Sequence, residues 1–383
     1  MKIPPLVDSN SVLSPDESRR YSRHTVIPQI AQEGQIRLKN AKVVCVGAGG
    51  LGSPILMYLA AAGVGELGIV EFDTVDESNL ARQVIHGQSD IGRSKIESAK
   101  AKIVEINPLI KVNIHEVRLD TSNAMEIFSD YDLIIDGSDN FATRYLINDA
   151  CVLLNKPYIW GSVLRFDGQA SVVWAKYGPC YRCLYPEPLI EALNCAQAGV
   201  LGVLCASIGS IQATEAIKLI TGIGQSLIGS LMVYDALSMS YELVKISKDP
   251  ECVICADKPS QLGLLADYEA FCSTVRPDAI TVIELKSKLD KGEDFYLVDV
   301  REPNEFEIVR IPGGVLVPLA GFIDGSALAA LPRDKEIILY CRSGVRSATA
   351  LAIVKEAGFN QSSHVEGGVL AWAKQVDPTC TVY

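Results

Sequence analysis

The chain has 383 residues, enough for two or three domains that each bury a core of their own. It is 48% hydrophobic and 21% charged, as ordinary globular proteins are, and its net charge of −11 argues against a nucleic-acid surface, which needs clustered Lys and Arg. The start has no apolar core of a signal peptide, and the longest uncharged run, 198–212, is too short and polar to cross a bilayer. We therefore expect a cytoplasmic protein without a membrane segment. Its eleven cysteines should be metal ligands, catalytic thiols or core residues, and not disulfides.

From Lys42 to Leu243 apolar strands alternate with helical stretches, as in a parallel sheet with helices on both faces. Apolar spacing predicts early helices at 94–107 and 140–154 and a later one at 206–222. The predicted strands are 42–47, 66–72, 131–137, 156–161, 168–175 and, within 229–246, the last of the series.

The pattern weakens between Asp257 and Asp278, which suits a linker or a docking segment. A second alternation starts near Ile280, and its hundred or so residues are enough for one small α/β domain. We therefore divide the chain into a first domain (1–256), a linker (257–279) and a second domain (280–383).

A glycine-rich turn follows the first strand. Gly47, Gly49 and Gly52 fit G-x-G-x-x-G between a strand and a helix, with Gly50 in the same turn, and such a backbone turns amide groups and a helix N-terminus toward a phosphate. Glu71 or Asp73, at the end of the next strand, could hold a ribose hydroxyl. The turn alone allows NAD, ATP or no ligand at all.

The residues after the acidic strand end favour a triphosphate. Asn79, Arg82 and Lys95 follow closely, and Asp139 comes after a later strand where it could hold Mg²⁺. A triphosphate carries more charge than a dinucleotide diester and needs cationic side chains, commonly with a metal. The alternative is that Arg82 and Lys95 are ordinary solvated charges.

Several motifs of this part resemble the MoeB/ThiF enzymes, bacterial relatives of the ubiquitin-activating enzymes: GAGGLGSP, FDTVDESNLARQ, GRSKIESAK and DGSDNFATRYLIND. The resemblance spans about 19–246. It implies a Rossmann-like, mixed-sheet domain that uses ATP and Mg²⁺ to adenylate the C-terminal glycine of a ubiquitin-like sulfur carrier. By position, it implies that Glu71 binds ribose, that Asp73 is a neighbouring acid, that Asp139 is the metal-binding and catalytic aspartate, and that Asn79, Arg82 and Lys95 contact phosphates. It also implies a homodimer in which Arg23 reaches the partner's ATP. Many relatives have Asp where this chain has Glu71.

Two C-x-x-C pairs predict a structural zinc site. Four thiolates on two tight turns complete a tetrahedron and leave no open position, and unrelated cysteines or a redox pair are the alternatives. The four predicted ligands are Cys180, Cys183, Cys252 and Cys255.

A further cysteine, Cys195, lies among small residues in NCAQAGVLG, which suggests a loop near the active face. Its thiolate could attack an acyl adenylate or a persulfide, although a small buried residue would look the same. These surroundings resemble those of the acceptor cysteine in rhodanese-fused members.

In the second domain Cys341 stands between a strand and a helix, where backbone amides, the helix dipole and Arg342 and Arg346 favour a nucleophilic thiolate. Four residues separate Cys341 from Arg346, one fewer than in phosphatases, and this tighter ring suits sulfur better than phosphate.

The segment 280–374 resembles a rhodanese through LVDVREPNEFEI, YCRSGVRSA and EGGVLAW. It implies that Cys341 carries a persulfide, received from a persulfide or thiosulfate donor, and that Asp299 and Arg301 brace the loop. Arg310 replaces the His of many rhodaneses, and an inactive rhodanese-like fold is the alternative.

Taken together, these features predict an adenylyltransferase and sulfurtransferase that converts a sulfur carrier to its thiocarboxylate, for molybdopterin or a related biosynthesis. An NAD-dependent oxidoreductase and a non-catalytic scaffold are the alternatives. The sequence ends in TCTVY, without Gly-Gly, so the chain is not itself expected to be the carrier.

Overall fold

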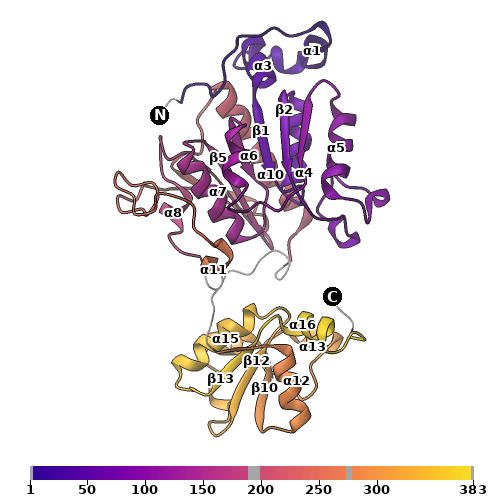
Figure 1. Ribbon diagram of the computed structural model, residues 1–383, viewed down its shortest axis with the longest axis vertical. Coiled ribbons are helices and arrows are strands. Elements are labelled where there is room, and N and C mark those ends of the chain that lie inside the picture. Colours follow the sequence, from indigo (N-terminus) through magenta and orange to yellow (C-terminus); the bar gives the residue numbers. More distant parts are fainter. Residues whose placement is uncertain (1–2, 189–198, 273–277, 381–383) are drawn as a thin grey trace. The chain divides into compact units, whose positions relative to one another are not determined.

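The computed structural model describes residues 3–188, 199–272 and 278–380, and they form two compact units, one ending at Cys272 and one beginning after it. Each unit is an α/β structure with a single sheet (Figure 1). The two units are described separately below.

The first unit holds an eight-stranded mixed sheet in the order β3-β2-β1-β4-β5-β6-β7-β8. Pairing is parallel from β3 to β5 and antiparallel from β5 to β8. The strands are β1 (Lys42–Val46), β2 (Glu66–Val70), β3 (Lys111–His115), β4 (Leu133–Asp136), β5 (Tyr158–Leu164), β6 (Asp167–Val173), β7 (Ser230–Asp235) and β8 (Ser240–Lys245).

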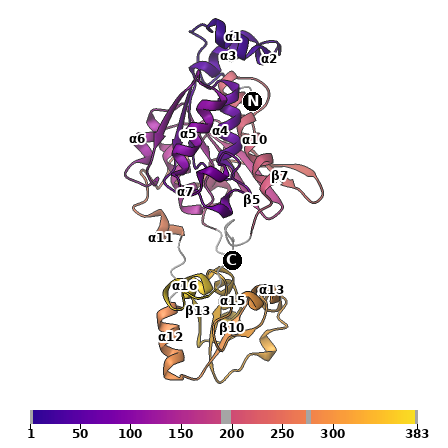
Figure 2. The ribbon, with the colours of Figure 1, turned by 90° about the vertical axis from the view of Figure 1, so that its right-hand side faces the viewer.

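Alternation along the strands divides the hydrophobic core in two. Val43 and Cys45 of β1 belong to one buried cluster, whereas Val44 and Val46 belong to the other, because successive side chains point to opposite faces. The first cluster is covered by α4, α5 and α10, and the second by α6 and α7 (Figures 1 and 2). The helices are α1 (Pro15–Arg20), α2 (Ser22–Thr25), α3 (Ala31–Asn40), α4 (Gly52–Ala62), α5 (Lys95–Ile106), α6 (Ala124–Ser129), α7 (Phe141–Leu153), α8 (Tyr181–Leu184), α10 (Gly202–Thr221) and α11 (Tyr268–Cys272).

Among the residues that the structure describes, one helix is long and apolar enough to cross a membrane by length and composition alone. This helix, α10, is instead a core element, because it packs along α4, β5 and β6 and Leu204, Ile208 and Ala216 on it are fully buried. It begins four residues before the predicted 206–222 stretch.

The predicted linker differs from the structure in one respect. Residues up to Cys272 belong to the first unit, and Tyr268 of α11 is buried there. The reason is a polar anchor: the Tyr268 hydroxyl donates to Asp149 Oδ2 at 2.7 Å, and Asp149 is fully buried. Residues up to Cys272 are thus attached to the first unit by a buried polar contact.

The second unit has a five-stranded parallel sheet in the order β11-β10-β12-β13-β9. Helices lie on both faces, and each face has its own buried cluster. The strands are β9 (Ala279–Ile280), β10 (Phe295–Asp299), β11 (Val315–Leu316), β12 (Glu336–Tyr340) and β13 (Ser362–Val365). The helices are α12 (Val282–Lys291), α13 (Pro303–Ile308), α14 (Leu319–Ile323), α15 (Val345–Glu356) and α16 (Gly368–Gln375).

Candidate active site

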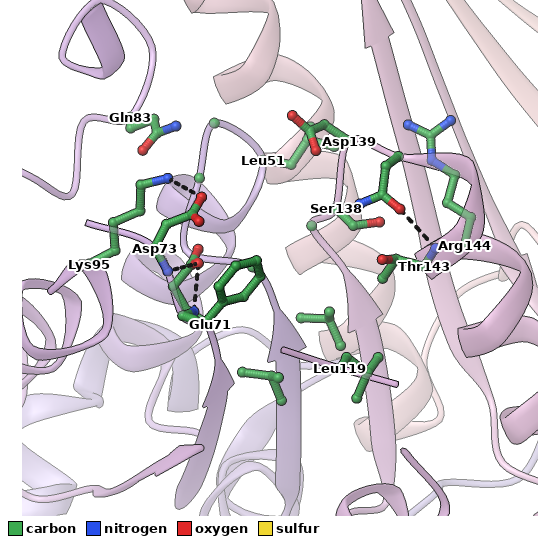
Figure 3. A pocket seen from close by; sticks show the side chains of 18 of the residues that line it. Leu51, Glu71, Asp73, Gln83, Lys95, Leu119, Ser138, Asp139, Thr143 and Arg144 are labelled. Atoms are coloured by element: carbon green, nitrogen blue, oxygen red, sulfur yellow. Dashed lines mark hydrogen bonds and ion pairs between the residues drawn. The ribbon is translucent and has the colours of Figure 1, made fainter. Parts of the chain in front are cut away.

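A pocket of about 200 Å³ opens beyond the carboxyl ends of β1, β2 and β4 in the first unit. Strand order reverses beside β1, which places the pocket at the switch point where open α/β sheets bind ligands. Figure 3 shows Lys95, Asp73 and Glu71 on one side of the pocket and Ser138, Asp139 and Arg144 on the other.

The predicted glycine turn forms the floor of this pocket. Gly47, Gly49 and Gly50 line it, and Gly52 begins α4. Gly47 has a φ of +95°, which favours glycine, and a Cβ on Gly52 would lie 2.0 Å from the Gly47 carbonyl oxygen. The turn therefore depends on glycine at both positions, and it places the start of a helix at the pocket.

Glu71 stabilises the glycine turn through hydrogen bonds to backbone amides. Its carboxylate accepts hydrogen bonds from the amides of Ala48 (3.0 Å), Phe72 (2.9 Å) and Asp73 (3.0 Å), and the residue is only 8% exposed. The extra methylene of Glu lets it reach from the end of β2 to the turn. Glu71 also lines the pocket, so the structure gives it a bracing role in addition to the ribose contact that its position predicts.

Asp73 and Lys95 form an ion pair at the same edge of the pocket, with 3.0 Å between Lys95 Nζ and Asp73 Oδ2. Lys95 is the first residue of α5, and its side chain is 8% exposed, whereas that of Asp73 is 52% exposed. Arg82 also lines the pocket and donates to the Ser78 carbonyl at 3.2 Å. Both predicted cations are therefore at the pocket.

Asp139 lies across the pocket on the loop after β4, and it is exposed. The loop is held by Asp136, whose Oδ1 accepts from the Ser138 amide (2.9 Å) and hydroxyl (2.6 Å), and by Asn140, which caps α7. Burial raises the pKa of Asp136. An accessible carboxylate facing a phosphate-sized turn is a suitable hard ligand for Mg²⁺.

Two predicted residues lie outside the pocket lining. Asn79 Oδ1 accepts from the Asp76 amide at 3.2 Å, so within this chain it caps a short helical turn. Arg23 lies exposed on α2, and α3, which follows, leads into the opposite, amino end of β1. A contact of Arg23 with a nucleotide would require a second subunit, as the resemblance implies.

Several residues that line the pocket were not predicted, and two of them, Gln83 and Cys205, lie at the glycine turn or beside Arg82. Gln83 is 5% exposed, and its Oε1 has no hydrogen-bond partner within the described residues, which fits a ligand that donates a hydrogen bond. Cys205 of α10 approaches the glycine turn so closely that a Cβ on Gly50 would lie 2.8 Å from its sulfur. In the sequence, the position of Gln83 directly after Arg82 in NLARQ is the one signal that could have indicated Gln83. No local signal indicates Cys205. Cys195 lies in 189–198, outside the described residues.

The four cysteines of the predicted zinc site converge. Their sulfurs all lie within 4.8 Å of one another, with hydrogen-bond-range distances of 3.8 Å (Cys180–Cys183), 3.5 Å (Cys180–Cys252) and 3.4 Å (Cys183–Cys255). A tetrahedral ion with Zn–S bonds of about 2.3 Å requires sulfurs about 3.8 Å apart. The donor set therefore fits Zn²⁺ and leaves no open coordination position.

In the second unit Cys341 directly follows β12 and is 1% exposed. The Gly344 amide donates to its Sγ at 3.1 Å. The carbonyls of Cys341 and Arg342 accept from the Val369 and Leu370 amides of α16 at 2.9 and 3.0 Å. These contacts fix the loop against the start of α16, and the Gly344 amide donates to the sulfur.

Two arginines of this unit are paired with carboxylates. Arg301 and Asp299 are fully buried and paired at 2.6 Å, and Arg301 also donates to the Val309 carbonyl. Arg346 forms a two-point ion pair with Glu305, at 2.6 Å for each contact. The expectation that Arg346 adds net positive charge at Cys341 is therefore offset by Glu305, a partner that the loop sequence does not indicate. Arg310 packs over the Phe306 ring at 5.3 Å.

Comparison with known proteins agrees with this two-unit organisation. The ThiF family matches residues 21–254, and the rhodanese-like domain matches residues 281–375. The chain is 55% identical to "Probable adenylyltransferase/sulfurtransferase MoeZ" of Mycobacterium tuberculosis H37Rv, covering 100% of this chain and 99% of that protein. It is 42% identical to "Adenylyltransferase and sulfurtransferase MOCS3" of Drosophila ananassae, covering 97% and 86%. Escherichia coli MccB with MccA-N7isoASN has a similar fold (TM-score 0.57, 23% identity), covering 67% of this chain and 77% of that one.

Proposed function

The chain belongs to the ThiF family and joins its ThiF unit to a rhodanese-like unit, and we propose that it activates a ubiquitin-like sulfur-carrier protein with ATP and then passes sulfur to it. It is an adenylyltransferase and sulfurtransferase, as its close relatives are named. The observation that carries the proposal is the pocket in which the glycine turn, Lys95 and Arg82 face Asp139. The ThiF and rhodanese-like matches favour this function over an NAD-dependent oxidoreductase.

Adenylation would use the pocket as follows. The C-terminal glycine carboxylate of the carrier attacks the α-phosphorus of ATP, and the bond to the β-phosphate breaks to release pyrophosphate. Arg82 and Lys95 supply positive charge for the phosphates, and the helix N-terminus after the glycine turn adds its dipole. Asp139 would hold Mg²⁺, which neutralises phosphate charge when bound. Glu71 or Asp73 would hold the ribose.

Sulfur transfer would use the second unit. Cys341, loaded by a persulfide or thiosulfate donor, attacks the carbonyl of the acyl adenylate through its outer sulfur and expels AMP. The resulting acyl disulfide is opened by a second thiol, for which we propose Cys195. This step releases the carrier thiocarboxylate and leaves a Cys195–Cys341 disulfide, which a dithiol reductant would return to two thiols.

The remaining assignments complete this proposal. The four-cysteine site would hold a structural zinc, the active form would be a homodimer with Arg23 reaching the partner's nucleotide, and the carrier would serve molybdopterin or a related synthesis. The protein would act in the cytoplasm.

Carrier-dependent ATP–pyrophosphate exchange tests the division of labour. We expect Arg82→Ala and Asp139→Ala to lower exchange by about 100-fold or more, because Arg82 would supply positive charge to the phosphates and Asp139 would hold the Mg²⁺ that does the same. Cys341→Ala should keep exchange and lose only thiocarboxylate formation, measured by mass spectrometry of the carrier. A scaffold without catalysis would leave both properties unchanged in Arg82→Ala and Asp139→Ala, and loss of exchange in Cys341→Ala would contradict the two-stage scheme.

A further inference from the structure

Three buried side chains form a chain of contacts beneath the sulfur-carrying loop. Ser347 Oγ lies 3.7 Å from Cys341 Sγ and 3.4 Å from Nδ1 of His364. Ser347 stands in the first turn of α15 and His364 on β13, so residues far apart in the sequence meet at the sulfur. All three residues are at most 7% exposed.

The effect of Ser347 on the Cys341 sulfur depends on which acceptor receives its hydroxyl hydrogen. The Ser347 hydroxyl has one hydrogen and three acceptors within reach: Cys341 Sγ, His364 Nδ1 and the Gly344 carbonyl at 2.9 Å. If Nδ1 is bare, it competes for that hydrogen. If Nδ1 carries a proton, it donates to Oγ instead, and the hydroxyl hydrogen is left for the sulfur or the Gly344 carbonyl. A negatively charged sulfur then attracts it more strongly than a neutral carbonyl does.

We propose that His364 is a positioning residue of sulfur transfer, which donates from Nδ1 to Ser347 Oγ and so directs the Ser347 hydroxyl at the thiolate or persulfide of Cys341. The proposal rests on the sulfurtransferase role of Cys341. It is consistent with the loop geometry, because the Gly344 amide approaches the same sulfur from the loop side at 3.1 Å. The sulfur would thus receive one hydrogen bond from the backbone and one from a side chain.

Two ion pairs lie close to these contacts, and Arg342 follows Cys341 on the loop. The His364 amide donates to the Asp278 carbonyl at 3.0 Å, and the Asp278 carboxylate is paired with Lys355 of α15. On the loop side, Arg346 is paired with Glu305. The contacts from His364 through Ser347 to Cys341 give β13 a direct path to the sulfur.

The test replaces His364 with Asn or Gln in the full chain, because these two side chains place an N–H donor at different positions. The side-chain nitrogen of Asn can occupy the Nδ1 position, whereas that of Gln lies nearer the Nε2 position. The measurement is the rate of Cys341 alkylation by iodoacetamide across a pH series, read from the Cys341 peptide by mass spectrometry. We expect His364→Asn to follow the native profile. His364→Gln should slow alkylation at neutral pH about tenfold and move the profile midpoint up by about one pH unit, the effect of losing one hydrogen bond to a charged group.

The Ser347→Ala variant tests whether His364 acts on Cys341 through the Ser347 hydroxyl. We expect Ser347→Ala to show the same loss, and the Ser347→Ala/His364→Gln double variant to lose nothing more, because His364 acts through the hydroxyl. Equal profiles for His364→Asn and His364→Gln, or an added loss in the double variant, would overturn the proposal. Thermal unfolding shows whether each variant is folded, and persulfide formation from thiosulfate gives a second pH profile. Because alkylation reads the thiol itself, failure of carrier sulfuration would not be mistaken for failure of this proposal.

Discussion

Replacing Asp149 with Asn should destabilise the first unit strongly, because this carboxylate is the centre of a buried network. It accepts from Arg182 Nε (2.9 Å) and Nη2 (2.8 Å), from the Tyr268 hydroxyl (2.7 Å) and from Gln261 Nε2 (2.8 Å). Asp149 is fully buried, and the Arg182 side chain is 3% exposed. The network joins α7, the first C-x-x-C turn and the docking segment before residue 273.

The size of the effect follows from the charge left behind. The substitution Asp149→Asn keeps the shape of the side chain but puts an amide group against a buried guanidinium that has lost its counter-charge. Breaking a buried ion pair from one side costs about 3–5 kcal/mol. At about 2–4 °C per kcal/mol for a unit of this size, the thermal midpoint should fall by about 6–20 °C.

The assay is thermal unfolding of the full chain followed by circular dichroism, with limited proteolysis of 256–272 as a local probe. Glu269→Gln is the matched control, since it removes an ion pair with Arg118 from the same segment. The side chains of that pair are 64% and 66% exposed, so it should contribute only about 0–1 kcal/mol. If Asp149→Asn melted within about 2 °C of Glu269→Gln, with unchanged proteolysis, the network would not anchor the segment.

Three further predictions concern the metal, the glycine turn and a buried carboxyl. Cys183→Ser should remove one equivalent of zinc by elemental analysis and lower the thermal midpoint, whereas a midpoint unchanged on metal loss would contradict a structural site. Gly52→Ala should abolish ATP binding in calorimetry, because its Cβ would lie 2.0 Å from a carbonyl oxygen, and Gly263→Ala, with nothing within 4 Å, should not. Since burial raises the pKa of Asp136, the native chain loses stability as pH rises, and Asp136→Asn should escape that loss. The variant's advantage in unfolding free energy should grow as the pH rises above the ordinary pKa of an aspartate, about 4, and a constant difference would refute the reasoning.

The parts of the fold and site that the sequence predicted are those with local signals. The strands β1 and β2, the glycine turn and the Cys341 loop follow from short runs whose residue types suit one backbone geometry. The strand β3 was not predicted, because KVNIH alternates polar residues at the sheet edge and none of its residues is fully buried. The two C-x-x-C pairs could be matched, although Cys180 and Cys252 are 72 positions apart, only because their spacing is itself distinctive.

The missed features depend on contacts between distant segments. The bracing of the glycine turn by Glu71, the compensation of Arg346 by Glu305 and the approach of His364 to Ser347 all join residues with no local signature. Each involves a polar group whose partner is fixed by sheet order and helix packing, which one sequence does not reveal. Local motifs therefore identified the chemistry, whereas the structure was needed to show how each reactive group is held.

The Cys341 loop and the pocket of the first unit differ in how they use cations. The difference follows from the proposed ligands, a single sulfur at the loop and several phosphates in the pocket. In the second unit Arg301 and Arg346 are both paired with carboxylates, and the Cys341 sulfur is contacted by an amide and a hydroxyl. Such short dipoles suit a single sulfur, which has one charge to stabilise. In the pocket of the first unit Lys95 is paired with Asp73, but within the described residues Arg82 forms no ion pair and bonds only a carbonyl. An uncompensated, partly exposed guanidinium can follow charge as it moves onto a leaving pyrophosphate. Of the two predicted cations, we therefore propose that Arg82 acts on the transition state and that the paired Lys95 is more firmly fixed in position.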